Sequence, residues 1–340
     1  MKKSVLLFGT LLLMTFYANA QISQIESILL ASKEDANKLA SAYFNPISKG
    51  FIYGTNAGWY HTAKVHKTFG FDVSFGLNAS MVPSEDEMYT ISALGLASIT
   101  SNSETAPTAL GGNNAPSVEV STTVEGQTVS ASFNLPSGFK DDFVFGGLPT
   151  ANMQFNLGLP YDFEAMLRFV PKVGNDNTTG ELLGFGLKKE ITEWFGPLDK
   201  LPLHVTLMGS FTNMKVNYGL SGNLGTATDK QINMKLNAYT VQAIASLNFP
   251  IINVYGGIGY SAGSSNYDML GTYELEYQTG NPIVPTITQS ITDPLSLTTQ
   301  ASSFTTTIGA RLSLGFLKIY GNYSIQEYNT ASLGMAISVF

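Results

Sequence analysis

Alternation of apolar and polar residues dominates the chain from about residue 50 to its end. In residues 67–78 (KTFGFDVSFGLN), every second residue from Phe69 to Leu77 is apolar, and small or polar residues lie between them. The alternation recurs in residues 150–159, 161–171, 203–211, 239–249, 254–260, 304–314, 319–325 and 333–339. Because successive side chains of a strand point to opposite faces, this period of two predicts a series of two-faced β-strands.

The polar face of these segments indicates what surrounds them. It carries mainly Gly, Ser, Thr and Asn, with few of the Lys and Glu residues that cover a soluble sheet, whereas the apolar face is rich in aromatic residues. Outside residues 1–20, no apolar run reaches the roughly 20 residues that a spanning helix needs. We therefore expect an all-β fold: a transmembrane antiparallel β-barrel with apolar side chains facing lipid and polar side chains facing the lumen.

Composition and charge narrow the class of protein further. Only 13% of the 340 residues are charged, against roughly 25% in an average soluble domain, and 44% are hydrophobic, which excludes intrinsic disorder. The chain has no cysteine, so disulfides and thiol chemistry are excluded. Its formal charge is −7, and removal of Lys2 and Lys3 with a signal peptide leaves 16 − 25 = −9. This charge predicts that the protein has no nucleic-acid partner.

The first 49 residues differ from the rest. Residues 1–20 have the pattern of a secretory signal peptide, with two basic residues, an apolar stretch and the cleavage pattern Ala18-Asn19-Ala20. Together with a barrel, this predicts export to the outer membrane of a Gram-negative cell. Residues 22–44 place apolar residues at helical spacing, which predicts one amphipathic helix or two short ones, closed by Asn45-Pro46. We assign residues 21–49 to an amphipathic helical plug or hatch and residues 50–340 to the barrel.

Loop lengths predict the number of strands, because such barrels alternate short periplasmic turns with long external loops. Counting back from a periplasmic C-terminus places periplasmic turns near 80–87, 159–160, 189–201, 249–250 and 314–316. External loops then fall at 62–66, 100–149, 172–180, 217–231, 263–300 and 327–330, which gives twelve spans. The long loops 100–149 and 263–300 contain alternating runs of their own, and if these enter the membrane the count rises to 14. In the turn 189–201, Ile191, Trp194 and Phe195 predict a short interfacial helix.

A few charged residues fall on the predicted lumen face. Glu164 and Arg168 share one face of a strand, Arg311 lies on the lumen face of another, and Asp72 alternates with apolar neighbours in a third. A charge facing the lipid midplane costs on the order of 2–4 kcal/mol, which supports this orientation. Two interpretations stay open for these residues. One is a structural ion-pair network that fills the barrel, and the other is a polar constriction that selects solutes.

The sequence contains no pattern of catalytic or metal-binding residues. His61 and His66 are assigned to the external rim with no partner readable from sequence, and with His204 they match no metal motif. We therefore predict no catalytic residues, no cofactor site and no metal site, so the protein is not expected to be an enzyme.

Several short motifs resemble those of a known family. They are Ala42-Tyr43-Phe44-Asn45-Pro46, Gly58-Trp59-Tyr60, Ala63 with His66-Lys67, and Gly70-Phe71-Asp72-Val73. Together they resemble an uncharacterised family of Bacteroidetes-type outer-membrane β-barrel proteins over nearly the whole mature chain. The resemblance implies the fold and the location, without an established activity.

A more distant similarity concerns the plug. A helical segment that ends in Asn-Pro before the first strand is similar to the outer-membrane long-chain fatty acid transporter family, although this chain has Asn45-Pro46-Ile47 where Asn-Pro-Ala is common. That similarity implies a hatch inside a 14-strand barrel and apolar substrates that leave sideways into the bilayer. At the other end, Phe340 is the terminal aromatic residue that barrel assembly machinery recognises, but the apolar series before it is one residue out of phase.

Three functional hypotheses follow from these patterns. The first is passage or uptake of a small molecule, a hydrophobic one included, past the hatch without covalent chemistry. Residues of the predicted plug–barrel junction would then contact the cargo or pack the plug; they are Phe44, Asn45, Pro46, Phe51 and Tyr53. The second is a structural or accessory barrel that anchors a protein partner through its long loops. The third is a secreted β-sandwich or adhesin. Expected partners are outer-membrane lipid, barrel assembly machinery and a small hydrophobic ligand.

Overall fold

The computed structural model describes residues 22–124, 127–143, 146–175, 178–220, 230–279, 282 and 285–339. The predicted signal peptide and Phe340 lie outside the described residues. No helix in the described part of the chain is long and apolar enough to cross a bilayer.

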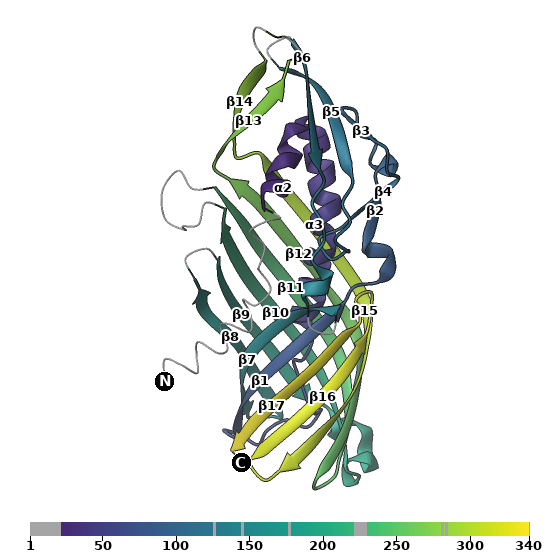
Figure 1. Cartoon of the computed structure of the whole chain (residues 1–340). Helices are drawn as coiled ribbons and strands as arrows, with labels where there is room; N and C mark the ends of the chain where they lie inside the picture. The colour runs from purple at the N-terminus through teal and green to yellow at the C-terminus, as the bar shows by residue number, and fades with distance from the viewer. Residues whose placement is uncertain are drawn as a thin grey trace.

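Ten antiparallel strands form a closed barrel in the order β1-β17-β16-β15-β12-β11-β10-β9-β8-β7 (Figure 1). The barrel closes because β1 pairs on one side with β17 and on the other with β7, so that Phe71 faces both Val339 and Leu157. The strands are β1 (Phe71–Met81), β7 (Gly147–Leu159), β8 (Phe163–Gly174), β9 (Thr178–Glu190), β10 (Leu203–Gly219), β11 (Gln231–Asn248), β12 (Ile252–Leu270), β15 (Leu295–Leu314), β16 (Leu317–Ile325) and β17 (Thr330–Val339). The predicted fold class is confirmed, but the barrel has ten strands instead of 12 to 14.

The two ends of the barrel differ. At one end, which we call the turn end, short connections at 160–162, 249–251 and 315–316 join neighbouring strands, and the last strand finishes there. The longer connection 191–202 at this end contains the predicted short helix, η6 (Thr192–Lys200), and exposes Trp194. The opposite end, the loop end, carries the long insertions between β1 and β7 and between β12 and β15.

Two of the twelve predicted spans, residues 50–62 and 87–100, are not barrel strands. Helix α3 (Lys33–Asn56) continues through Pro46 to Asn56, so the predicted barrel boundary at residue 50 moves to Phe71. Residues 57–70, which we call the inner coil, connect the helix to β1. The short strands β2 (Met88–Thr90) and β3 (Ile99–Ser101) occupy the second predicted span and lie at the loop end.

Because these two segments are not barrel strands, β1 crosses the barrel in the direction opposite to the predicted one. Residues 62–66 lie at the turn end and not in an external loop, and residues 82–87 lie at the loop end and not in a periplasmic turn. The remaining spans keep the predicted direction, because one span is lost on each side of β1.

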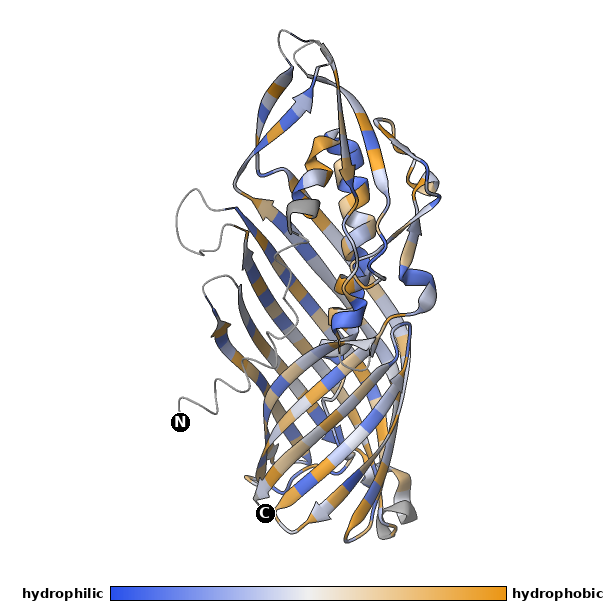
Figure 2. Ribbon diagram, in the orientation of Figure 1, coloured by the Kyte–Doolittle hydropathy of each residue, from blue (hydrophilic) through white to orange (hydrophobic). Residues whose placement is uncertain are grey.

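The outward and inward faces of the strands have the predicted polarity. Large apolar side chains are exposed on the outside, among them Phe185, Ile258 and Phe304, whose exposed fractions are 56%, 65% and 82%. Hydroxyl and amide side chains such as Thr206, Thr240 and Gln154 are buried inside. Figure 2 shows the result as bands of contrasting hydropathy along each strand. This is the pattern of a transmembrane β-barrel, which is apolar where it meets lipid.

Ile258, near the middle of the outward face of β12, provides a test of this orientation. We expect Ile258→Lys to lower the free energy of unfolding in lipid vesicles by about 2–4 kcal/mol, because it places a charge in the hydrocarbon layer. Thr298→Lys, on the outward face of β15 near the loop end, is the matched control and should change it little. The effects are measured by urea titration. Equal effects at the two positions would contradict the conclusion that Ile258 lies in an apolar belt around the barrel and Thr298 lies outside it.

The predicted external loops 100–149 and 263–300 fold together into one cap. They supply four strands of a five-stranded sheet, β14-β13-β6-β5-β3, and β3 at its edge pairs with β5. The cap strands are β5 (Ser117–Val124), β6 (Gln127–Asn134), β13 (Thr272–Gln278) and β14 (Thr286–Thr292), while β4 (Thr105–Pro107) pairs with β2. The alternating runs in both loops therefore form strands, but these strands lie outside the barrel.

An apolar core joins the cap to the plug helix. Leu39 and Tyr43 of α3 belong to one buried cluster with Val120, Leu135 and Tyr273 of the cap. Helix α2 (Ile22–Ser27) also lies under the cap, and the second half of α3 enters the barrel (Figure 1). The same cluster continues along the second half of α3, through Ile47 and Ile52, to wall residues such as Leu236, so apolar packing extends from the cap into the barrel.

Candidate functional site

The start of α3 is fixed to the cap by polar contacts. Ser32 caps the helix by accepting a hydrogen bond from the backbone N–H of Asp35 at 3.2 Å. The carboxylate of Asp35 in turn accepts hydrogen bonds from the backbone N–H groups of Ala97 and Ser98 and from the Ser98 hydroxyl. Burial raises the pKa of Asp35, but these hydrogen bonds outweigh burial and lower it overall.

Arg168 holds the other end of α3. Its Nη1 donates to the carbonyl oxygens of Thr55 and Ala57 at 2.9 and 3.1 Å, where the helix leaves carbonyls without partners. Its Nε and Nη2 donate to Oε1 of Gln154, and the guanidinium lies 3.9 Å from the centre of the Trp59 ring. Arg168 is fully buried, so every contact of its charge is made inside the protein. A cation at the C-terminus of a helix also interacts favourably with the helix dipole.

Beyond Trp59, the inner coil is bound to the lumen wall through its backbone as well as through side chains. The N–H of Ala63 donates to Oγ of Ser246 at 3.0 Å, and the hydroxyl of Thr206 donates to the carbonyl oxygen of Ala63. The N–H of Val65 donates to Oε2 of Glu190 at 3.0 Å. Strands β9, β10 and β11 thus each supply a side chain that pairs with one stretch of coil.

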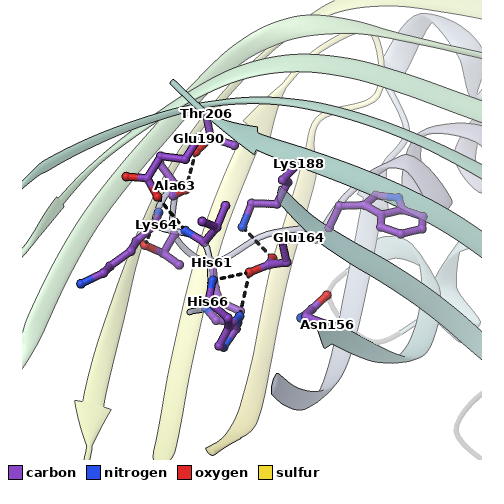
Figure 3. A network of polar contacts seen from close by, with 12 residues as sticks. His61, Ala63, Lys64, His66, Asn156, Glu164, Lys188, Glu190 and Thr206 are labelled. Atoms are coloured by element: carbon purple, nitrogen blue, oxygen red, sulfur yellow. Dashed lines mark hydrogen bonds and ion pairs between the residues drawn. The ribbon is translucent and has the colours of Figure 1, made fainter. Parts of the chain in front are cut away.

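A cluster of charged side chains surrounds the end of the inner coil (Figure 3). The carboxylate of Glu164 lies between Nζ of Lys188, at 2.8 Å, and Nδ1 of His66, at 2.7 Å. Oδ2 of Asp72 lies 3.2 Å from Nε2 of His61 and 3.3 Å from Nε2 of His66. Glu164, Lys188 and Asp72 are each at most 2% exposed, so their charges are balanced by one another and not by bulk water.

The two histidines of the coil have different partners and therefore different charge states. Nδ1 of His61 lies 3.0 Å from Nη1 of Arg311, which can only donate, so His61 accepts there, and its Nε2 faces Oδ2 of Asp72 at 3.2 Å. Burial lowers the pKa of His61, which keeps it neutral. Burial also acts to lower the pKa of His66, but its hydrogen bonds to Asp72 and Glu164 outweigh this and raise the pKa to about 9.

The structure brings all four predicted lumen residues inside the barrel. Asp72, Glu164 and Arg311 belong to the cluster around the two histidines, and Arg168 binds the end of α3. These side chains pair with one another and with the inner coil, and both interpretations, a network that fills the barrel and a polar constriction, stay predictions.

Sequence analysis missed three members of the network. Lys188 carried a usable signal, because it alternates with outward-facing Phe185 and Leu187 and is therefore in lumen phase. His61 and His66 were assigned to the external rim and lie instead at the turn end, since the direction of β1 is reversed. The alternation that orients strand residues does not exist in a coil, so the contacts of these histidines with Asp72 could not be predicted from the sequence.

The predicted plug–barrel junction lies near the loop end. Phe44 stacks on Tyr267 with ring centres 5.3 Å apart, and the hydroxyl of Tyr53 donates to Oε2 of Glu327 at 2.5 Å. Phe51 is buried in the apolar cluster of the cap. Asn45 and Pro46 lie within α3 and do not end it, contrary to prediction. The contacts of these residues are those of ordinary plug packing.

The described residues contain no group of three or more His, Asp or Glu residues placed to hold a metal ion. The expected absence of cofactors and of catalysis stays a prediction.

Several solved structures are similar to this chain at a low level. The attachment invasion locus protein Ail of Yersinia pestis is 9% identical, with 80% of this chain and 99% of that one covered and a TM-score of 0.28. The translocator domain of autotransporter NalP from Neisseria meningitidis is 11% identical, with 88% and 96% covered and a TM-score of 0.28. The outer membrane protease OmpT from Escherichia coli is 9% identical, with 79% and 94% covered and a TM-score of 0.30. Similarity this low says nothing about the activity of this chain.

Comparison of the sequence with models of protein families shows the family of this chain. No curated protein matches the chain. These findings do not show a Bacteroidetes-type origin or a relation to fatty acid transporters; the resemblance to an uncharacterised family is confirmed. The model of the "Family of unknown function (DUF6588)" matches residues 1–339, and the chain therefore belongs to that family.

Proposed function

We propose that the protein spans a bacterial outer membrane and admits a small solute through its lumen when the inner coil leaves its position. One observation carries this proposal. The inner coil, which obstructs the turn end, is attached to the wall by hydrogen bonds and ion pairs, with one small apolar cluster around Trp59 and Tyr60.

Polar attachment permits movement because water can replace it. A hydrogen bond exchanged for a bond to water changes the free energy by only about 0.5–1.5 kcal/mol, whereas exposing an apolar side chain costs about 1.5–3 kcal/mol. One large apolar cluster extends from the cap along α3, whereas the inner coil contributes only Trp59, Tyr60 and Ala63 to a second cluster of seven residues. The coil is therefore the part of the plug that moves, and the cap stays in place.

The chemistry of the lumen favours a polar solute. Buried side-chain atoms that have no protein partner among the described residues include Asn152 Nδ2, Ser210 Oγ, Thr212 Oγ1, Asn253 Oδ1 and Arg311 Nε. Such atoms pair with water or with a hydrogen-bonding solute. The hydrophobic cargo implied by the similarity to fatty acid transporters remains a prediction, and the lumen wall argues against it.

A disulfide between the inner coil and the wall tests the proposal, since the chain has no cysteine of its own. Oγ1 of Thr62 lies 3.3 Å from Oγ of Ser246, so Thr62→Cys with Ser246→Cys places two sulfurs within reach. When reduced, this variant lacks the bonds of Thr62 to Ser246 and Asn248 and the bond from the Ala63 N–H to Ser246, and we expect its open probability in planar bilayers to rise about tenfold. When oxidised, it should conduct no more than the wild type.

The control pair is Ile258→Cys with Thr306→Cys, which are register partners on neighbouring strands and do not touch the coil. Oxidation of this pair should leave the current unchanged. If the Thr62/Ser246 variant carries the same current in both redox states, or none in either, the inner coil is not a gate.

Anchoring of a protein partner remains the second candidate, because one strand edge of the cap is open. In the described sheet, β14 pairs only with β13, and its Thr288, Gln289 and Ser290 are exposed. An unpaired edge can accept a strand from another chain. A barrel that never conducts, but captures a membrane protein in a pulldown that Gln289→Pro abolishes, would favour anchoring over passage.

A further inference from the structure

The outward face of the barrel has a hollow of about 720 Å³ that crosses β10, β11, β12 and β15. Its floor is made of small residues, with Ala262 opposite Ser302 and Gly263 opposite Ala301 in the β12–β15 ladder. No large side chain projects from these positions, so a depression remains in the wall. Because Ala262 and Ser302 are in outward phase, the hollow opens to the surroundings and not to the lumen.

Aromatic rings border the hollow on the side of the turn end. Phe211, Tyr239 and Tyr260 line it, and each is at least 40% exposed on the outside of the barrel. Further toward the turn end the outward face becomes mainly apolar, with Val241 on β11 and Ile258 on β12. Tyrosines at this position are typical of the level where the hydrocarbon layer meets the headgroups.

The opposite side of the hollow is polar. Asn237 and Gln300 supply amide groups, and Ser264 and Ser302 supply hydroxyls. Amides and hydroxyls beside exposed aromatic rings suit a sugar, whose ring packs on the aromatic face while its hydroxyls form hydrogen bonds. The hollow is thus aromatic and apolar on the side of the turn end, and its opposite side carries groups that form hydrogen bonds.

Lysines follow one step nearer the loop end. Lys215 and Lys235 are register partners on β10 and β11, and Lys172 and Lys215 line a smaller adjacent hollow. Two carboxylates lie at the same level: Glu181, 3.0 Å from Lys215, and Asp268, which accepts a hydrogen bond from Ser296. Lys235 is exposed and has no ion pair within the described chain. Cationic charge is therefore in excess here, although the whole chain has a formal charge of −7.

We infer that this hollow binds the phosphorylated sugar headgroup of a glycolipid in the outer leaflet. The sugar occupies the hollow against Tyr239 and Tyr260, the acyl chains lie along the apolar belt, and a phosphate meets Lys235. The order of apolar, aromatic, amide and cationic groups along the outward face matches the order of groups in such a lipid. This inference rests on the proposed membrane location, but it does not depend on a conducting lumen.

Native mass spectrometry of the full-length protein in phosphatidylcholine nanodiscs tests the inference. The probes are a bisphosphorylated disaccharide glycolipid, its dephosphorylated form and phosphatidylglycerol. We expect the phosphorylated glycolipid to bind most tightly, and Ser302→Trp, which fills the hollow, to weaken it by about tenfold or more. Lys235→Glu should weaken the phosphorylated form and leave the dephosphorylated form unchanged. Ile308→Trp, in the apolar belt of the same strand, is the matched control and should have no effect.

Two results would overturn the inference. One is equal binding of the glycolipid and phosphatidylglycerol. The other is glycolipid binding that Ser302→Trp leaves unchanged, which would indicate a non-specific layer of lipid around the barrel. Failure of the membrane proposal is distinguishable, because a protein that does not insert into nanodiscs yields no complex with any lipid. A protein that inserts and never conducts still tests the lipid site.

Discussion

Replacing Arg168 with Met is expected to lower the free energy of unfolding by at least about 3 kcal/mol, because three buried acceptors lose their hydrogen bonds to a charged donor and each such bond contributes about 1.5–3 kcal/mol. The acceptors are the carbonyl oxygens of Thr55 and Ala57 and Oε1 of Gln154. Methionine retains most of the apolar contact with Trp59, so the loss reports on the hydrogen bonds. Urea titration in lipid vesicles, followed by heat-modifiable migration on gels, measures the change.

Lys64→Met is the matched control, since Lys64 lies on the same inner coil with an exposed side chain. Its effect should stay within about 0.5 kcal/mol, as for most surface substitutions. Arg168→Lys separates charge from geometry: it keeps the cation but loses the planar fork that reaches three acceptors, and we expect an intermediate loss. If Arg168→Met is no worse than Lys64→Met, the end of α3 does not depend on this guanidinium.

The barrel and its lumen charges were predictable because strand phase is a local signal. Asp72, Glu164 and Arg168 each alternate with apolar neighbours that face outward, so their own direction is set by their position in the sequence. The same reasoning applied to residues 178–190 identifies Lys188. The alternation along a strand predicts that a charged side chain faces the lumen, but it does not predict which other charged side chain it contacts.

The plug was harder to predict for a physical reason. From Ile47 to Asn56, α3 is enclosed by the barrel on all sides, and both apolar Ile52 and polar Thr55 are buried. A helix without an exposed face has no hydrophobic periodicity of its own, so its last turns were assigned to a strand. Pro46 also indicated a helix end, yet tertiary packing inside the barrel keeps the helix intact past it.

The cap shows a different limit of the sequence. Residues 117–134 alternate as strands should, and they form the hairpin β5–β6, but alternation does not tell whether a two-faced strand covers a lumen or an apolar core. Here the buried face, with Val118, Val120 and Val129, packs over α3 and not against lipid. This distinction depends on contacts between segments that are far apart in the sequence, and it decides whether these runs count as barrel strands.

The ion pair between Glu164 and Lys188 is expected to give the second large effect. Glu164→Gln leaves Lys188, 2% exposed, without a carboxylate partner, and removal of one member of a buried ion pair costs about 3–5 kcal/mol. The new amide still offers an oxygen to the N–H of His66, so that contact is largely preserved. The free energy of unfolding in vesicles at neutral pH measures the loss.

The second substitution in the pair decides whether charge is the cause. Adding Lys188→Met to Glu164→Gln removes the unpaired cation, and we expect the double variant to be more stable than Glu164→Gln alone, since a buried ion pair replaced on both sides is often close to neutral. His66 keeps Asp72 as its carboxylate partner in both variants. If the losses of stability caused by Glu164→Gln alone and by Lys188→Met alone simply add in the double variant, the two residues are not coupled. The buried charges near the inner coil then do not act as one network. Recovery in the double variant would instead mean that the coil is held by balanced charge, which a solute or a change in hydration at the turn end can disturb.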